Sequence, residues 1–340
     1  LVREEVNANM GALTEHIDFR KTFAAWKCPE FDDSSWKAAE IIEAAAPGFE
    51  MNFGLLKPLR LEERPIPLMY EAPGMLVKEL GEPVFAACGN KSENKEPGCV
   101  YAEADCNDYI IVGPNQKISI LWDGANLFNA YFAYRFEGGK DAEVSFTYFE
   151  KFTAPADANT KKAADADNDM SGDVSPETSD GVGFKKIKRD DYINGVIGAN
   201  GQTDTIILAG DTVYEPFWYR TMRFLKIDIE TKDEPLKMYR PGFKKTGYPL
   251  NAGSFVKSSD EWVEKVYAMC QRTLESCMMD SYMDCPFWEQ MQYPMDTRLQ
   301  AMFTYICSTD TKLAKKALSD FHDSMLPMGL IQGRAPSSIK

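Results

Sequence analysis

The chain has 340 residues, of which 44% are hydrophobic and 26% charged, a composition typical of globular proteins that fold in water. Its length favours two or three compact units, and no stretch approaches the roughly 18 uninterrupted apolar residues that a membrane helix needs, so we expect no membrane span. The net charge of −14 would repel a phosphate backbone, which argues against nucleic acid as a partner.

Residues 1–64 are mixed in pattern, and the stretch WKCPEFDDSSWKAAEIIEA is their one recognisable element. The chain begins with Leu1 rather than Met, and its first residues lack the apolar core of a signal peptide. We therefore expect it to be part of a longer or processed protein, and the residues alone leave its compartment unknown.

From residue 65 to 240 the pattern becomes that of β-strands. Short apolar runs, several alternating with polar residues, are separated by Gly, Asn, Asp or Pro, and no amphipathic helical stretch lies between them. We predict an antiparallel β-sandwich rather than βαβ units. The main runs are YIIVG (109–113), KISILWD (117–123), NAYFAYRFEG (129–138), AEVSFTYFEKF (142–152), TIILAG (205–210) and MRFLKIDIE (222–230).

A polar segment rich in small residues, 154–191, interrupts the sandwich and predicts a long surface loop. Part of it, 165–178, imitates a calcium-binding loop. Thr178 stands where such a loop carries a bidentate Glu, so we prefer a solvated loop and leave calcium binding open. The residues that imitate the ligands and the turn are Asp167, Asp169, Ser171, Gly172 and Asp173.

The eight cysteines form no C-x-x-C pair and no spacing typical of zinc. Cys270 and Cys277 would lie about 10 Å apart on a helix, too far for a disulfide. We expect most cysteines to be buried thiols, and we expect neither a metal nor another cofactor.

Pro and Gly between 241 and 257 predict a linker, after which the hydrophobic period becomes helical. A first helix opens near Ser258, Ser259 or Asp260. A second runs over 296–308 and a third over 309–326, so we predict the start of an all-α domain over 258–340. The apolar face of the first helix comprises Trp262, Val266, Met269, Cys270, Thr273, Leu274 and Cys277.

Three acids lie among rings where the first helix gives way to the second. Pro286 disfavours a helical Cys285, and Pro294 suits a first helical turn. Asp284 and Glu289 therefore belong to a connecting loop, and Asp296 to the first turn of the next helix, whose dipole favours its ionised form.

This loop also carries Phe287, Trp288, Met291 and Tyr293, which would be unfavourable in water, so we expect it to cover a core or line a concave site. Rings beside carboxylates suit a sugar, because rings pack on its C–H faces and acids bind its hydroxyls. Apolar surroundings also raise the pKa of a carboxyl, as a general acid requires. The alternative is that Asp284 and Asp296 cap helices and Glu289 is a surface residue.

The run DCPFWEQMQYPMD (284–296) resembles the signature of bacterial α-L-rhamnosidases, family 78 of the glycoside hydrolases. In that signature a Glu follows the Asp of Asp-Cys-Pro by five residues and a second Asp follows it by twelve. Other parts of the family are resembled by FDDSSWKAA (31–39), ILWDGANLFNAYFAYRFEGGKDAEVSFTYFE (120–150), GDTVYEPFWYRTMRFLKIDI (210–229) and MGLIQGRAPSS (328–338).

The resemblance implies a β-sandwich followed by the first helices of an (α/α)6 toroid, with 1–64 as the end of a jelly-roll-like accessory region. It implies hydrolysis of terminal α-L-rhamnosyl linkages with inversion, a rhamnose-containing oligosaccharide or glycoside as the partner, and a periplasmic or secreted location. Glu289 would be the general acid, while Asp284 and Asp296 would bind sugar hydroxyls. An inverting enzyme also needs a base roughly 6.5–9.5 Å from the acid. In the family that base lies beyond the position of Lys340, so we expect this chain alone to be inactive.

Two departures from the signature concern the walls of the sugar site. Many family members have Arg before the Glu and Gly-Trp-Thr-Gly before the last Asp, where this chain has Trp288 and QYPM. Trp288 or Tyr293 can stack on a sugar or only pack the loop onto a helix. A glycosidase for a different sugar, and a carbohydrate-binding protein without catalysis, therefore stay as alternatives.

Overall fold

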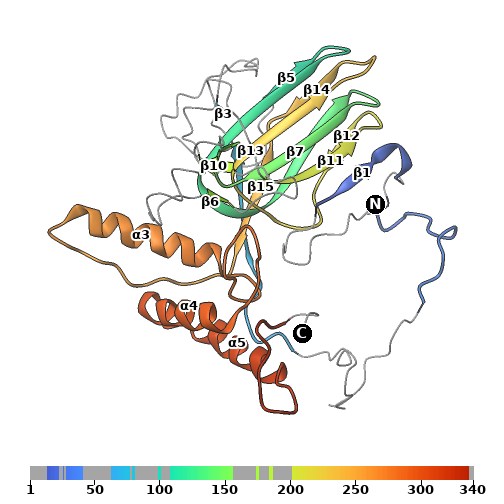
Figure 1. The fold of residues 1–340 in the computed structure, drawn as a ribbon. Coiled ribbons are helices and arrows are strands. Elements are labelled where there is room, and N and C mark those ends of the chain that lie inside the picture. The colour runs from blue at the N-terminus through green and yellow to red at the C-terminus, as the bar shows by residue number, and fades with distance from the viewer. Residues whose placement is uncertain are drawn as a thin grey trace.

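The computed structural model describes residues 14–22, 26, 28–40, 63–76, 79–80, 99–100, 108–155, 174–175, 184–186 and 201–336. Strands form one part of the molecule, and three helices lie beside it at the C-terminal end of the chain (Figure 1). The predicted order, β-rich part first and helices second, is confirmed.

A short 3-10 turn (Phe19–Lys21) follows the first strand. The strands are β1 (His16–Asp18), β2 (Tyr70–Leu76), β3 (Glu79–Leu80), β4 (Cys99–Val100), β5 (Tyr109–Val112), β6 (Lys117–Gly138), β7 (Glu143–Phe149), β8 (Thr153–Pro155), β9 (Val174–Ser175), β10 (Phe184–Lys186), β11 (Gln202–Ile207), β12 (Thr212–Tyr214), β13 (Arg220–Glu230), β14 (Leu236–Tyr239) and β15 (Gly242–Gly247).

The 22-residue strand β6 connects the two layers of the sandwich. Its first half pairs with β13 and β3, and its second half pairs with the beginning of β13 and with β15, β12 and β14. Between these halves the register jumps: Asp123 faces Phe224, and Phe128 faces Met222. Residues 124–127 therefore bulge, and because a bulge bends its strand, β6 can curl around the core (Figure 1).

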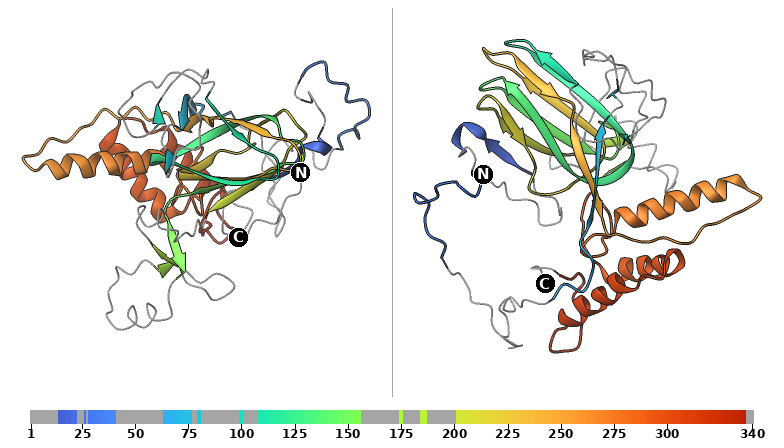
Figure 2. Two further views of the ribbon diagram at one scale, coloured as in Figure 1. Left: turned by 90° about the horizontal axis from the view of Figure 1, so that it is seen from above. Right: turned by 180° about the vertical axis from the view of Figure 1, so that it is seen from behind.

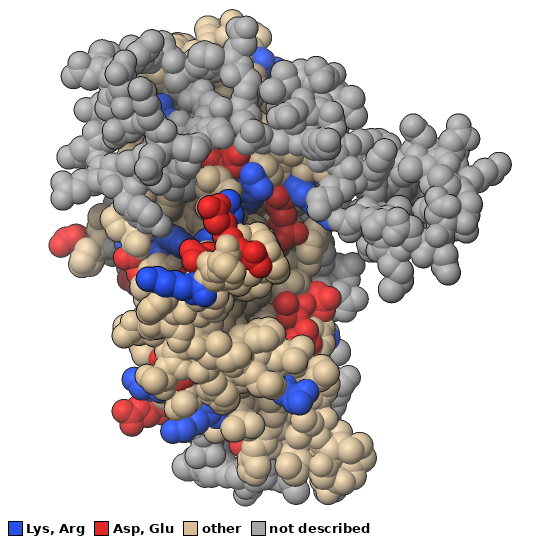
Figure 3. All heavy atoms as spheres, turned by 90° about the vertical axis from the view of Figure 1, so that its left-hand side faces the viewer, with Lys and Arg blue, Asp and Glu red and all other residues tan. Residues whose placement is uncertain are grey.

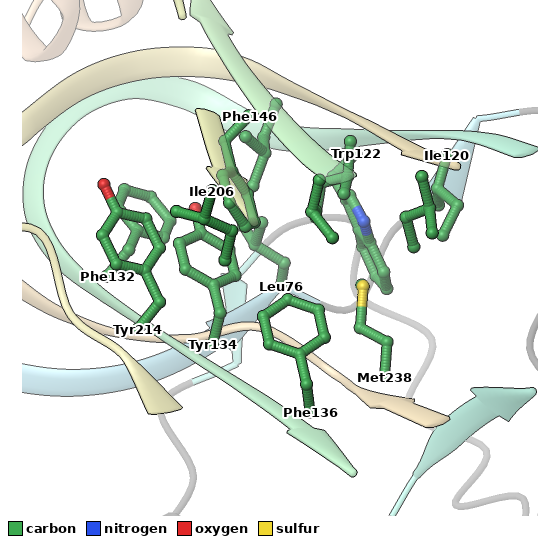
Figure 4. Packing of buried hydrophobic residues seen from close by; sticks show 14 of the residues in the cluster. Leu76, Ile120, Trp122, Phe132, Tyr134, Phe136, Phe146, Ile206, Tyr214 and Met238 are labelled. Carbon is green, nitrogen blue, oxygen red and sulfur yellow. The ribbon is translucent and has the colours of Figure 1, made fainter. Parts of the chain in front are cut away.

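Rings fill the core between the layers (Figure 4). The Tyr134 and Phe146 centroids are 4.1 Å apart, and Trp122 has no exposed surface. The Tyr134 and Tyr148 hydroxyls lie 2.9 Å apart, so each supplies a partner that a buried polar group needs. The alternation of apolar and polar residues read from the sequence thus corresponds to the inward and outward faces of these strands.

The ladders are antiparallel except that β1 runs parallel to β11, with His16 opposite Thr205. The strand pairing is held by a buried ion cluster. Arg220 donates to both carboxylate oxygens of Asp204, at 2.8 and 2.9 Å, and to Glu15 at 3.2 Å. Because Glu15 precedes β1, this cluster attaches the N-terminal described segment to the sandwich. The predicted boundary at residue 64 stays a prediction.

The predicted surface loop over 154–191 is described in part. Its described residues lie in β8, β9 and β10, which pair as a small antiparallel sheet in the order β8-β10-β9. The residues that imitate calcium ligands, from Asp167 to Asp173, and Thr178 lie outside the described residues. Among those that the structure does describe, no group of three or more His, Cys, Asp or Glu is arranged to hold a metal ion.

The helices are α3 (Glu261–Ser276), α4 (Pro294–Cys307) and α5 (Lys312–Asp323). All three predicted helices are therefore present, and Pro294 occupies the first turn of α4 as expected. None of the described helices is both long and apolar enough to cross a bilayer. That these helices begin an (α/α)6 toroid stays a prediction.

The apolar face predicted for α3 is buried only at its C-terminal end, where Leu274 and Cys277 reach the core. Trp262, Val266 and Met269 are exposed, because α3 projects away from the sandwich (Figures 1 and 2). The side of the molecule formed by the helices shows a broad uncharged area (Figure 3). Exposed apolar side chains of α4 are Met295, Leu299, Met302, Phe303 and Ile306.

The side chains of five cysteines are described, and these are free thiols in different environments. Cys277 and Cys307 are buried and Cys285 is half-buried, whereas Cys28 and Cys270 are exposed. The absence of a bond between Cys270 and Cys277 is confirmed. Cys270 is exposed because it lies on the part of α3 that projects into solvent. That most of the eight cysteines are buried stays a prediction, since the other three side chains lie outside the described part of the structure.

Candidate active site

The connection from α3 to α4 is anchored by buried side chains. Tyr282 has no exposed surface, and its hydroxyl lies 2.9 Å from that of Thr304 on α4. Phe287 is also fully buried, and its carbonyl accepts a hydrogen bond from Gln202 of β11 at 3.1 Å. Phe287 therefore packs into a core, one of the two placements expected for this loop, whereas Trp288, Met291 and Tyr293 are half-buried.

Asp284 closes the loop that carries Glu289. Its backbone N–H donates to the Met291 carbonyl at 2.9 Å, and its Oδ1 accepts from the Met291 N–H at 2.9 Å. Inside the closed loop, the Glu289 N–H donates to the Cys285 sulfur at 3.1 Å, and Gln290 adopts a φ of 55°. These contacts hold Glu289 in an ordered turn, where a functional side chain can be positioned.

The Glu289 carboxylate is bound by a neighbouring phenol. The Tyr293 hydroxyl donates to Glu289 Oε2 at 2.5 Å. This contact raises the pKa of Tyr293, and Arg334 beside the hydroxyl opposes the increase. The structure thus brings Glu289 and Tyr293 together, with a cation nearby.

Arg334 lies in the segment that follows α5. The sequence alone did not indicate that this segment contributes to the site. Gln292 binds Ala335 twice: its carbonyl accepts from the Ala335 N–H at 3.1 Å, and its side-chain amide donates to the Ala335 carbonyl at 2.7 Å. Arg334 in turn contacts the Met291 sulfur at 2.8 Å. The only signal in the sequence is the resemblance over 328–338, which assigns no role to Arg334.

Trp288 is fixed by a carboxylate from the sandwich. Its indole N–H donates to Glu150 Oε2 at 3.0 Å, and Phe287 meets it edge to face with centroids 4.8 Å apart. Burial raises the pKa of Glu150, although the indole hydrogen bond opposes the increase. Sequence reasoning did not select Glu150, whose only signal is an acid at the end of the apolar run AEVSFTYFEKF.

Asp296 lies in the first turn of α4, one turn after Tyr293. Tyr293 occupies the N-cap position, and no side chain caps this helix. Asp284 binds the Met291 N–H instead of a helix end. The alternative in which Asp284 and Asp296 serve as helix caps is therefore not observed. All five predicted site residues are half-buried: Asp284, Trp288, Glu289, Tyr293 and Asp296.

Comparison with protein families places this loop in a known context. Residues 251–340 match the model of the bacterial alpha-L-rhamnosidase 6 hairpin glycosidase domain. The family resemblance is confirmed. The matched range includes α3, α4, α5 and the loop that carries Glu289. Among curated proteins, none matches this chain.

Solved structures of rhamnosidases are similar in fold. A rhamnosidase from Klebsiella oxytoca with rhamnose bound is 14% identical, with a TM-score of 0.51 over 81% of this chain. An alpha-L-rhamnosidase from Dictyoglumus thermophilum is 15% identical, with a TM-score of 0.54 over 97%. One from Streptomyces avermitilis, complexed with L-rhamnose, is 15% identical, with a TM-score of 0.52 over 95%.

The chain spans less than half the length of each of these proteins: 48%, 29% and 24% in the same order. At these identities the likeness concerns the fold. The beta-rich part and the helices that follow it therefore have counterparts in larger rhamnosidases.

Proposed function

We propose that this chain is part of a glycoside hydrolase that releases terminal α-L-rhamnosyl units with inversion, and that Glu289 is its general acid. The observation that carries the proposal is the contact of Glu289 with Tyr293 on a loop closed by Asp284. The family match over 251–340 supports the reaction class. The rhamnose bound to two of the similar proteins supports a rhamnose-containing substrate.

In this mechanism Glu289 gives its proton to the glycosidic oxygen as the bond to the sugar breaks. Tyr293 donates to Oε2, so Oε1 is the oxygen that carries the proton toward the leaving group. After the transfer, the phenol stabilises the carboxylate that forms, because a hydrogen bond to a charged acceptor is stronger than one to a neutral acceptor. Tyr293 thereby acts as a positioning residue for the acid.

The other predicted residues bind the sugar. Asp284 uses Oδ1 to close the loop, and we assign its second oxygen to a sugar hydroxyl. Asp296 lies one turn beyond Tyr293 and receives a second hydroxyl. Trp288, held by Glu150, offers the rigid apolar surface on which a C–H face of the sugar stacks. We assign no residue of this chain as the base of the inverting reaction.

The test is hydrolysis of an aryl α-L-rhamnoside by the full-length protein. Glu289→Gln should lower kcat by about 100-fold or more, because it removes the transferable proton. Glu261→Gln, an exposed substitution in the first turn of α3, is the matched control and should leave kcat unchanged. Wild-type activity in the Glu289→Gln variant would remove Glu289 from the acid's role.

A second candidate keeps this chemistry and changes the sugar. Trp288 replaces the Arg that many family members carry before the Glu, and its contact with Glu150 makes it a fixed wall. A panel of aryl glycosides separates the two candidates by which sugar gives the highest kcat/KM. Sugar binding that survives in a protein without hydrolysis on any of them would favour a carbohydrate-binding role.

A further inference from the structure

A cavity of about 210 Å³ lies where the C-terminal end of α3 meets the bend of β6. The five candidate site residues, Asp284, Trp288, Glu289, Tyr293 and Asp296, do not line it. Its walls come from four elements, β2, β6, β15 and α3. The lining side chains that matter below are Tyr70, Asn126, Phe128, Lys245, Arg272 and Glu275.

The β6 bulge makes one wall and has a fixed shape. The Ala125 N–H donates to Asp123 Oδ1 at 2.8 Å, and Ala125 adopts a φ of 66°. A Cβ at Gly124 would lie 2.6 Å from a ring carbon of Phe128 and 3.1 Å from the Arg223 carbonyl oxygen, so only glycine fits there. Bulges and left-handed residues of this kind are concentrated at binding sites.

Aromatic rings provide the apolar part of the lining. Phe128 and Phe243 pack with their centroids 5.1 Å apart and are almost completely buried. Tyr70 is half-buried on β2 and lies beside Gly247, at whose position a Cβ would be 3.2 Å from the phenol ring. A ligand in this cavity therefore meets an apolar surface on one side.

Two cations line the same cavity. Lys245 is half-buried on β15, and Arg272 is exposed on α3. Within the described part of the chain, neither side chain forms an ion pair, whereas the adjacent Lys244 binds Glu71 at 2.8 Å. Lys245 and Arg272 therefore offer positive charge to the cavity, in a chain whose net charge is −14.

The third charged group, Glu275, accepts a hydrogen bond from Gln271 at 2.9 Å. Among the described residues that line the cavity, two cations and one acid give an excess of one positive charge. A carboxylate would match that excess, because a guanidinium binds a carboxylate through two parallel hydrogen bonds. Asn126, which also lines the cavity, has an amide suited to hydroxyls, whereas the Ser276 hydroxyl already donates to the Arg272 carbonyl at 2.9 Å and can only accept a further hydrogen bond.

We propose that this cavity binds one acidic sugar unit, a six-membered ring that carries a single carboxylate. The carboxylate lies between Lys245 and Arg272, and the ring packs against Tyr70 and Phe128. The volume fits one ring with its substituents, since a cavity of about 150 Å³ already holds benzene. The choice of a sugar over another carboxylate rests on the proposed function.

Calorimetric titration of the protein tests the site, with D-glucuronate and D-galacturonate as probes and with D-glucose and inorganic phosphate as comparisons. At least one uronate should bind with a Kd of about 1 mM, and glucose and phosphate at least tenfold more weakly. Lys245→Met and Arg272→Gln should each weaken uronate binding about tenfold. Lys244→Met, in which the neighbouring lysine loses its charge, should bind as the wild type does.

Arg272 is exposed on α3, so its substitution keeps the test valid if Lys245→Met fails to fold. Equal binding of phosphate and uronate, unchanged uronate binding in both cavity variants, or no uronate binding would each overturn the proposal. Hydrolysis and uronate binding are measured separately, so a failure of the proposed function can be told from a failure of this site. Glu289→Gln should lose hydrolysis and keep uronate binding, whereas the cavity variants should hydrolyse the aryl rhamnoside at the wild-type rate.

Discussion

The Tyr293 hydroxyl donates a hydrogen bond of 2.5 Å to Oε2 of Glu289. The two residues lie on different elements, because Glu289 belongs to the loop and Tyr293 is the N-cap residue of α4. Pro294 fixes the first turn of that helix and therefore the position from which the phenol reaches the acid. The orientation of the carboxyl thus depends on where the helix begins.

Tyr293→Phe should lower kcat by roughly 10- to 100-fold, because a hydrogen bond to a charged group contributes about 1.5–3 kcal/mol. KM should change little, since the lost contact is with the acid and not with the sugar. The measurement is kcat and KM for an aryl rhamnoside across a range of pH. A role in orienting Glu289 predicts that the pH profile also moves.

The matched control is Tyr305→Phe, which removes the hydroxyl of an exposed tyrosine on the same helix. It should leave both the rate and the pH profile unchanged. An unaltered kcat and pH profile in Tyr293→Phe would show that Tyr293 does not position the acid.

Glu150 gives a pH-dependent prediction. Burial raises its pKa above the ordinary value of 4.5, so the folded protein binds this proton more tightly than the unfolded chain does. The stabilising effect is complete below the unfolded pKa and is lost as pH rises through the folded pKa. Glu150→Gln, which keeps an oxygen to accept from Trp288, should therefore gain stability relative to the wild type as the pH rises above 4.5.

Thermal melts at several pH values, followed by tryptophan fluorescence, measure this difference in Tm. Glu143→Gln at the exposed start of β7 is the control and should show no such trend. If the Tm difference between Glu150→Gln and the wild type were constant with pH, burial of the Glu150 charge would not affect folding.

The helices and the loop that carries Glu289 could be predicted because their signals are local. Pro294 and the helical period indicate where α4 begins. Pro286 disfavours a helical Cys285, which predicts that α3 ends before Asp284, and α3 does end at Ser276. The hydrogen bond between Trp288 and Glu150 joins residues 138 apart in the chain. No local pattern encodes such a contact, since it depends on how the sandwich and the loop pack together.

The same limit explains what sequence reasoning misplaced. The helical period of α3 predicted an apolar face that is buried only at its C-terminal end. Trp262 and Cys270 are exposed, because periodicity does not show what a face packs against. The parallel pairing of β1 with β11 was missed for a similar reason. It is stabilised by the ion cluster of Glu15, Asp204 and Arg220, whose members come from three distant segments.

Arg220→Met should destabilise the protein by about 3–5 kcal/mol, because it leaves the buried Asp204 and Glu15 without their cation. The midpoint of urea denaturation measures the change. Lys117→Met removes a cation whose ion pair with Glu230 is exposed at the sandwich surface, and its effect on the midpoint should be much smaller, because exposed ion pairs contribute little to stability. Equal losses of stability in the two variants would mean that the buried Arg220 cluster contributes no more to stability than the exposed pair of Lys117 and Glu230.

Gly124→Ala tests whether the β6 bulge has the close packing described above. The added methyl would lie 2.6 Å from Phe128 and 3.1 Å from the Arg223 carbonyl oxygen, and a backbone oxygen cannot move aside as a flexible side chain can. We expect a loss of about 1–3 kcal/mol in the free energy of unfolding, with weaker uronate binding because the cavity wall shifts. Gly253→Ala is the control, since nothing lies within 4 Å of a Cβ at that position. Stability equal to the wild type in Gly124→Ala would mean that the bulge can rearrange freely.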